Sequence, residues 1–291
     1  MTSGTLSSSA TPPFPATLSP SRASDFMTCP LLFRLRSIDR LPEPPSPAAI
    51  RGSLVHRALE NLFDLPAAER TPQAATALVG EALAELERDY PEAARAVVPE
   101  PGDPLDVEAL IAAYFALEDP RRLEPHSREL GVRAAVEPEF ELRGFIDRVD
   151  VSPTGLVRIV DYKTGRSPGP GFEAKAMFQM RFYALAWWRM TGNVPTLLRL
   201  MYLGNRETLE YEPTEGDLLA TERKVLALRA AIAQAADAGQ FEPKPSRLCD
   251  WCAHRSVCPA WGGTPPPLPA RADWPTSSRS GDVVDDAEPE G

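Results

Sequence analysis

The spacing of hydrophobic residues changes along this chain. From about residue 20 to 117, apolar residues recur at three- and four-residue intervals, as in the stripe Leu54, Ala58, Leu59 and Leu62, and this period predicts helices. Ser21 is a candidate N-cap for the first helix. The proline-rich stretch 97–104 should interrupt the helices within residues 72–117.

Alternating apolar and polar residues predict a meander of strands between residues 129 and 163. A helix should follow at 173–190, then strands at 196–204 and 207–213, and a long helix that ends at Gly239, a favourable C-cap. This order predicts a mixed α/β domain with a central sheet. Four aromatic residues of the 173–190 helix could stack on unpaired bases, but their helical spacing favours the core: Phe178, Phe182, Trp187 and Trp188.

The composition is that of a globular protein with two unusual ends. Residues 1–17 are rich in Ser, Thr and Pro, and residues 263–291 are rich in proline and acidic at their end, so we expect both tails to be disordered around a folded domain at 18–262. The net charge of −10 argues against a general nucleic-acid coat protein, although five arginines between residues 22 and 51 leave room for a local basic surface. No signal peptide or membrane span is evident, so we expect a cytoplasmic protein.

Three of the charged residues in the predicted hairpin are candidates for a common site. Asp161 and Lys163 are two residues apart and share one strand face. If the loop spans residues 152–156, Val151 pairs with Val157 and Asp147 falls opposite Asp161.

Two adjacent carboxylates repel each other, and a divalent cation such as Mg²⁺ or Mn²⁺ would relieve that repulsion. Such a cation can neutralise charge on a phosphodiester, and a nearby lysine can orient water or stabilise the transition state. The alternative is a surface ion pair between Asp161 and Lys163, with Asp147 a solvated strand residue.

The segments "GFID" (144–147) and "DYKTG" (161–165) together resemble the PD-(D/E)XK nuclease superfamily, in particular its RecB-like exonuclease branch. The resemblance implies a restriction-endonuclease-like fold: a mixed central sheet flanked by helices, with an N-terminal helical part and a C-terminal cysteine cluster. It implies that Asp147 and Asp161 are metal ligands and that Lys163 is the catalytic lysine. The backbone carbonyl of Tyr162 would complete the metal shell, while its ring lies in the core.

Two further motifs fit the same branch. "GSLVHRALE" carries a Gly-x-x-x-His pattern, which implies that His56 is a metal ligand. "QMRFY" carries a Gln-x-x-x-Tyr pattern, which implies that Gln179 and Tyr183 approach the active site. Without the resemblance, His56 could be an ordinary helical histidine, and Gln179 and Tyr183 could belong to a packed amphipathic helix.

The cysteines form the pattern C-x₂-C-x₅-C at Cys249, Cys252 and Cys258, with Cys29 far upstream. In a reducing compartment such cysteines are metal ligands or free thiols. The pattern resembles iron–sulfur RecB-like nucleases of the AddB and CRISPR-associated types, which implies a [4Fe–4S] cluster held by all four cysteines. Zinc and unligated thiols are the alternatives. We expect Trp251, His254 and Arg255 to surround the cluster.

The expected function is a Mg²⁺- or Mn²⁺-dependent DNA exonuclease that hydrolyses phosphodiester bonds of single-stranded or frayed DNA in repair or recombination. The sequence lacks a G-x-x-x-x-G-K-[ST] loop, so we expect any helicase to act in trans. The alternative is a non-catalytic nucleic-acid-binding scaffold that partners a helicase.

Overall fold

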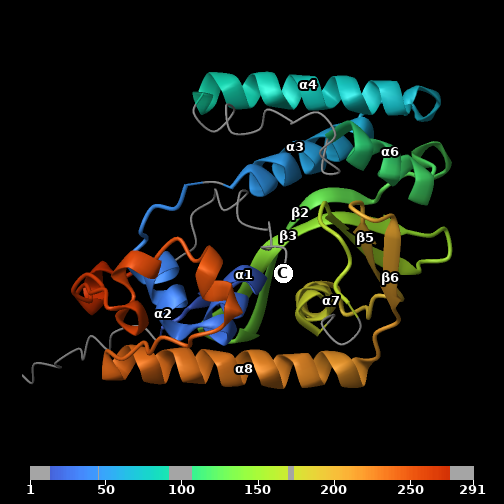
Figure 1. Ribbon diagram of the computed structural model, residues 1–291. Helices are drawn as coiled ribbons and strands as arrows, with labels where there is room; N and C mark the ends of the chain where they lie inside the picture. Colours follow the sequence, from blue (N-terminus) through green and yellow to red (C-terminus); the bar gives the residue numbers. More distant parts are fainter. Residues whose placement is uncertain (1–13, 45, 92–106, 170–173, 276–291) are drawn as a thin grey trace, which may run out of the picture.

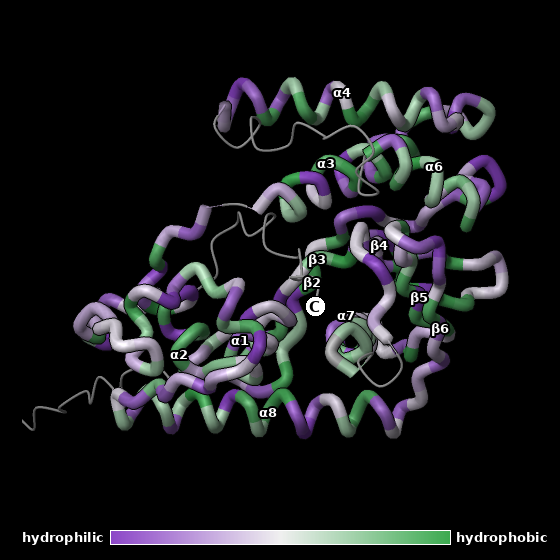
Figure 2. The backbone as a smooth tube through the Cα atoms, in the orientation of Figure 1, coloured by the Kyte–Doolittle hydropathy of each residue, from purple (hydrophilic) through white to green (hydrophobic). Residues whose placement is uncertain are grey.

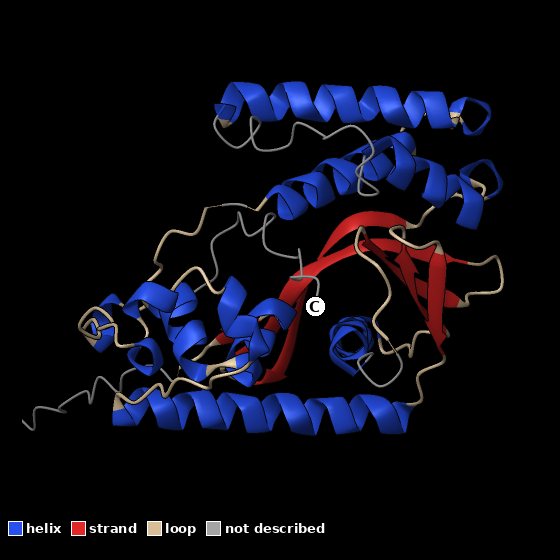
Figure 3. Cartoon of the chain, viewed as in Figure 1, coloured by secondary structure: helices blue, strands red, loops and turns tan. Residues whose placement is uncertain are grey.

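The structure is a computed structural model that describes residues 14–44, 46–91, 107–169 and 174–275. In these described segments, six strands form one sheet, and helices cover both of its faces (Figures 1 and 3). In chain order the elements are β1 (Thr17–Leu18), α1 (Pro20–Thr28), α2 (Pro30–Phe33), α3 (Pro47–Leu62), α4 (Pro72–Asp89), α6 (Val107–Leu117), β2 (Ser127–Glu137), β3 (Phe140–Val151), β4 (Val157–Lys163), α7 (Ala174–Thr191), β5 (Leu197–Tyr202), β6 (Glu207–Tyr211) and α8 (Glu215–Ala238). The mixed α/β prediction is confirmed.

The sheet runs in the order β1-β3-β4-β5-β6, and β2 pairs with β3. Strand β3 lies parallel to β1 and antiparallel to β2 and β4, whereas β4 and β5 are parallel. A parallel pair needs a crossover connection, and α7 supplies it between β4 and β5. This crossover brings α7 against the sheet next to β4.

Two hydrophobic cores lie on opposite sides of β4, because successive side chains of a strand point to opposite faces. Val157 and Ile159 join the core between the sheet and helices α7 and α8. Val160 and Tyr162 join the core between the sheet and helices α3, α4 and α6. In Figure 2, hydrophobic and hydrophilic residues alternate along α4 and α8, as expected of helices with one exposed face. Phe178, Phe182 and Trp187 are buried, as the helical spacing predicted.

The predicted helix boundaries are largely confirmed. Helix α8 ends at Gly239, whose φ of 64° is left-handed, and α3 buries the predicted stripe of Leu54, Ala58, Leu59 and Leu62. The N-cap of α1 is Ser19 and not Ser21, because the Ser19 hydroxyl accepts the Arg22 N–H and Pro20 occupies the first helical position. The predicted break at 97–104 lies outside the described residues.

The described parts of both predicted tails pack against the domain. Phe14 and Trp274 are 8% and 6% exposed, and their ring centroids lie 4.9 Å apart. The indole Nε1–H of Trp274 donates to the Pro269 carbonyl. The tail prediction missed these contacts because it rested on average composition, in which one aromatic residue has little weight. Residues 1–13 and 276–291 lie outside the described residues.

None of the helices in the described part of the chain combines the length and the apolar character needed to cross a bilayer.

Candidate active site

Strands β3 and β4 separate at the point where the predicted site begins. Val151 pairs with Val157 across residues 152–156, which confirms the predicted register, and the ladder continues to the pair of Arg148 and Val160. At the next position the backbone ladder ends. There, Asp147 Oδ2 accepts the backbone N–H of Tyr162 at 2.7 Å. Asp147 therefore lies one step beyond the ladder, as the partner position of Asp161.

Helix α3 brings His56 to the same end of β4. A Cβ at Gly52 would make an ordinary 3.4 Å contact with Thr164 Oγ1, so this face of α3 lies against the residue that follows β4. One turn later, His56 Nε2 lies 2.8 Å from the carbonyl oxygen of Tyr162, and Nδ1 lies 3.5 Å from Asp147 Oδ2. Burial disfavours the charged imidazole, but the negative charges of Asp147 and neighbouring acids outweigh it and raise the pKa of His56.

Tyr162 connects this site to a buried ion-pair network. Its hydroxyl accepts a 2.6 Å hydrogen bond from Arg148 Nη1, and its pKa is raised, first by burial. Arg148 is fully buried and binds Glu118 through two hydrogen bonds of 2.6 and 2.9 Å. Because the charges are paired, this network can exist inside the core, where it fixes the strand that carries Asp161 and Lys163.

Asp161 and Lys163 lie together on the α7 side of β4. Lys163 Nζ lies 3.1 Å from Asp161 Oδ2 and donates to Gln179 Oε1 at 2.8 Å. Asp161 is 3% exposed, so it does not belong to a surface ion pair, which was the alternative interpretation. Gln179 comes from α7, so this turn of the helix lies beside Lys163.

Tyr183 lies one turn beyond Gln179 and packs over strand β3. A Cβ at Gly144 would lie 2.7 Å from Tyr183 Cε1, closer than real Cβ contacts, so only glycine fits beneath the ring. The Gly-x-Ile-Asp and Gln-x-x-x-Tyr segments are therefore in direct contact.

Sequence reasoning missed Glu129 on β2. One ligand atom from each of His56, Glu129 and Asp147 lies within 4.8 Å of the others. Burial and the negative charge of Asp147 raise the pKa of Glu129 to about 7. The sequence does place Glu129 in the strand before "GFID". The side of the sheet on which its side chain lies depends on a backbone irregularity that no sequence pattern predicts.

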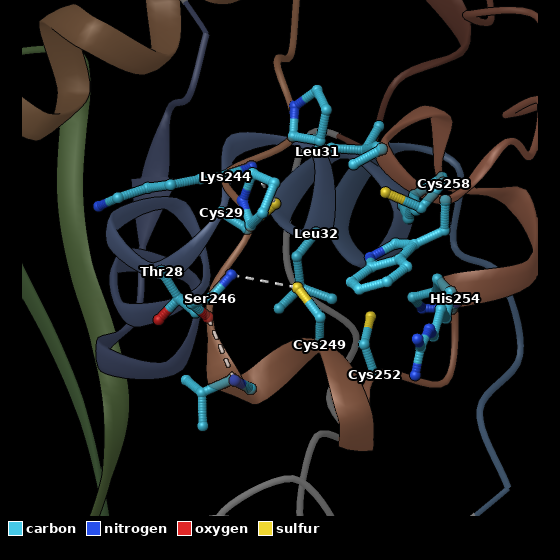
Figure 4. Close-up of a pocket in the computed structure, with 17 residues that line it drawn as sticks. Thr28, Cys29, Leu31, Leu32, Lys244, Ser246, Cys249, Cys252, His254 and Cys258 are labelled. Carbon is cyan, nitrogen blue, oxygen red and sulfur yellow. Dashed lines mark hydrogen bonds between the residues drawn. The ribbon is translucent and has the colours of Figure 1, made fainter.

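The four cysteines line one pocket that is in part open to solvent (Figure 4). The N–H of Lys244 donates to Cys29 Sγ, and the N–H of Ser246 donates to Cys249 Sγ, each at 3.3 Å. Burial raises the pKa of the Cys252 thiol. The pocket joins the start of the folded chain to its end, although the described thiols do not form a group of three within 4.8 Å.

The residues expected around the cysteines have different environments. His254 is buried, and its Nε2 lies 2.5 Å from Glu43 Oε1. Burial acts to raise the pKa of Glu43, but hydrogen bonds from His254 and Arg36 lower it to about 2. Trp251 is 58% exposed. The Arg255 guanidinium lies 3.9 Å from the ring centroid of Trp261.

Comparison with known proteins decides the family. The sequence profile of the PD-(D/E)XK nuclease superfamily matches residues 17–259. The chain belongs to this superfamily. A crystal structure of a "Putative exonuclease" from Eubacterium rectale covers 83% of this chain and 89% of its own, with 16% identity and a TM-score of 0.52, which supports the PD-(D/E)XK fold.

A curated relative, the Gene 69 protein of Mycobacterium phage L5, is 36% identical over 126 residues. The match spans 42% of this chain and 41% of the phage protein. PD-(D/E)XK nucleases generally use divalent metals, and the group formed by His56, Glu129 and Asp147 could hold such an ion.

Proposed function

We propose that this PD-(D/E)XK protein is a Mg²⁺- or Mn²⁺-dependent DNA exonuclease. The observation that carries the proposal is the convergence of His56, Asp147, Asp161 and Lys163 at one end of β4. These residues come from α3, β3 and β4, and a merely structural ion pair would not require all of them. The intact set disfavours the non-catalytic scaffold.

The donor set suits a hard divalent cation. Asp147 and Asp161 supply carboxylate oxygens, His56 supplies an imidazole nitrogen, and the Tyr162 carbonyl lies beside that imidazole. When bound, the cation would neutralise charge on the phosphodiester and lower the pKa of bound water.

Lys163 is the proposed catalytic lysine. Gln179 and Asp161 hold its ammonium group between α7 and β4, and a charge fixed in this way can stabilise the transition state without reorganising. Tyr183, on the same face of α7 as Gln179, would form the edge of the site where the substrate lies. Gln179 and Tyr183 therefore act in the proposal as positioning groups near the scissile phosphate.

We further propose that Cys29, Cys249, Cys252 and Cys258 hold a [4Fe–4S] cluster. All four line one pocket, and backbone N–H groups point at two of the sulfurs, as is favourable for cluster thiolates. One zinc ion, with Zn–S distances of about 2.3 Å, would draw the four sulfurs to about 3.8 Å from each other. No three of the described thiols lie within 4.8 Å of one another, so a single zinc ion would require them to move closer. The role of the cluster would be to tie residue 29 to residues 249–258.

The substrate would be single-stranded or frayed DNA, in repair or recombination, with a helicase acting in trans. This choice rests on the resemblance to RecB-like exonucleases. The site is equally able to hold any phosphodiester, so end-labelled single-stranded DNA, duplex DNA and RNA should be compared directly.

The test is a nuclease assay on anaerobically purified protein with Mg²⁺, Mn²⁺ or a chelator. Asp161→Asn and Lys163→Met should each abolish cutting, whereas Asp237→Asn and Lys224→Met, at exposed positions, should retain it. Exonuclease action predicts mononucleotides or short products that accumulate from one labelled end. DNA binding without any metal-dependent cutting would instead favour the scaffold.

The cluster is tested on the same preparation. Iron and acid-labile sulfide should each approach about four per chain, with broad visible absorbance that Cys252→Ser removes. Stoichiometric zinc without sulfide would overturn the cluster proposal and leave the nuclease proposal untouched.

A further inference from the structure

Glu129 lies beside the proposed metal ligands but has no role in the motifs discussed above. Among the residues that the structure describes, its carboxylate forms no hydrogen bond or ion pair. It is also half-buried, so water does not fully solvate it. A carboxylate in this position is unfavourable unless something binds it.

The backbone aims Glu129 at the site. Arg128 pairs with Arg148 and Leu130 pairs with Ile146, so Glu129 is the partner position of Asp147, yet the ladder skips this pair. The φ of Glu129 is 42°, a left-handed conformation that is uncommon for residues other than glycine, asparagine and aspartate. Regular pairing on both sides holds the residue in this conformation.

Three electron-pair donors, from His56, Glu129 and Asp147, lie close together beside the end of β4. A carbonyl oxygen only accepts hydrogen bonds, so His56 Nε2 must donate to the Tyr162 carbonyl, and the neutral imidazole then has its lone pair on Nδ1. Nδ1 is 3.5 Å from Asp147 Oδ2, too far for a good hydrogen bond. With the Glu129 carboxylate inside the same 4.8 Å group, the donors surround a position suited to a cation.

We infer that Glu129 is an additional ligand of the catalytic divalent cation, on the His56 and Asp147 side of the site. The inference deepens the proposed nuclease function and rests on it for the identity of the cation. One imidazole and two carboxylates suit Mn²⁺ well, since imidazole favours transition metals and carboxylates favour hard cations. Asp161 lies outside this group and faces Lys163.

Mn²⁺ binding to the full-length, cluster-loaded protein tests this inference without reference to activity. Titration calorimetry and the loss of the free Mn²⁺ electron paramagnetic resonance signal should show at least ten-fold weaker binding, or one site fewer, in Glu129→Gln. Glu129→Asn is a second variant, because asparagine tolerates a positive φ while removing the carboxylate. Glu137→Gln, on the same strand but paired with Arg229, is the matched control and should bind Mn²⁺ as the unmodified protein does.

Thermal melting in chelator separates folding from binding. Both Glu129 variants should melt within a few degrees of the unmodified protein in chelator. In Mn²⁺ their melting temperatures should rise less than that of the unmodified protein, since stabilisation by a ligand increases with the logarithm of its affinity. Unchanged Mn²⁺ binding in both variants would overturn the inference, even if the unmodified protein cuts DNA. Weakened binding in a protein that never cuts DNA would sustain the ligand and overturn the nuclease proposal instead.

Discussion

Gly144 and Tyr183 are packed so closely that no side chain can stand between them. A Cβ on residue 144 would lie 2.7 Å from Tyr183 Cε1 and 3.5 Å from its hydroxyl oxygen. The contact locks α7 against β3, and Gln179 lies one turn away on the same helix. The position of the Lys163 partner therefore depends on a glycine in another strand.

Gly144→Ala should push Tyr183 and the adjacent turn of α7 away from the sheet. Overpacking of this kind destabilises by about 1–3 kcal/mol, and the displacement of Gln179 should lower nuclease activity at least ten-fold. Urea unfolding and initial rates measure the two effects. Gly131→Ala is the control, because its Cβ would make an ordinary 3.5 Å contact with the exposed Phe145 ring. Equal losses in both variants would contradict the argument.

Gln179→Ala removes the 2.8 Å partner of Lys163 without removing any proposed metal ligand. We expect kcat to fall by about ten- to one hundred-fold, in the range of lost transition-state positioning, while the Mn²⁺ affinity stays the same. Met190→Ala, at an exposed position near the end of α7, should affect neither quantity. A large loss of Mn²⁺ affinity in Gln179→Ala would show that Gln179 acts on the metal and not on Lys163.

Local periodicity predicted strands β2 to β6 and the long helices but missed β1. The hairpin register also required the assumption that Asp147 and Asp161 share a site. Val151 faces Val157 because a two-residue period and a carboxylate pair leave few alternatives. The motif residues were also found, since they lie at short, fixed spacings. Their roles as ligands and catalytic groups remain proposals.

What the sequence did not reveal depends on distant contacts. A skipped ladder pair and a positive φ orient Glu129 toward Asp147. Neither feature changes the alternation of polar and apolar residues in the sequence. The buried Arg148–Glu118 pair joins segments 30 residues apart. Trp274 packs on Phe14 from the opposite end of the chain, although both lie in segments whose composition predicts disorder.

Trp274→Ala should be strongly destabilising in spite of its place in a proline-rich segment. Removing a large buried aromatic side chain typically lowers the free energy of unfolding by about 3–5 kcal/mol. Trp251→Ala is the matched control, because 58% of Trp251 is exposed and its loss should change stability by about 0.5 kcal/mol or less. Urea unfolding of both variants distinguishes them, and equal stability would mean that the Trp274 contacts contribute little.

Glu118 should make the domain sensitive to acid. Burial acts to raise its pKa, but the hydrogen bonds and charge of Arg148 outweigh burial and lower the pKa below the ordinary value of 4.5. A carboxyl group with a lowered pKa in the folded state stabilises the fold fully above its unfolded pKa. That stabilisation is lost as the pH falls from about 4.5 through the lower, folded pKa.

Glu118→Gln isolates this contribution. At pH 7 the variant should be less stable by about 3–5 kcal/mol, because it leaves the buried Arg148 without its bidentate carboxylate. The difference in the free energy of unfolding between the two proteins should narrow as the pH is lowered from 5 to 3. Asp237→Asn, at a position that is 74% exposed, should show no such change. A Glu118→Gln difference that stays constant across this range would mean that Glu118 binds its proton equally well in the folded and unfolded chain, and that Arg148 does not hold it ionised.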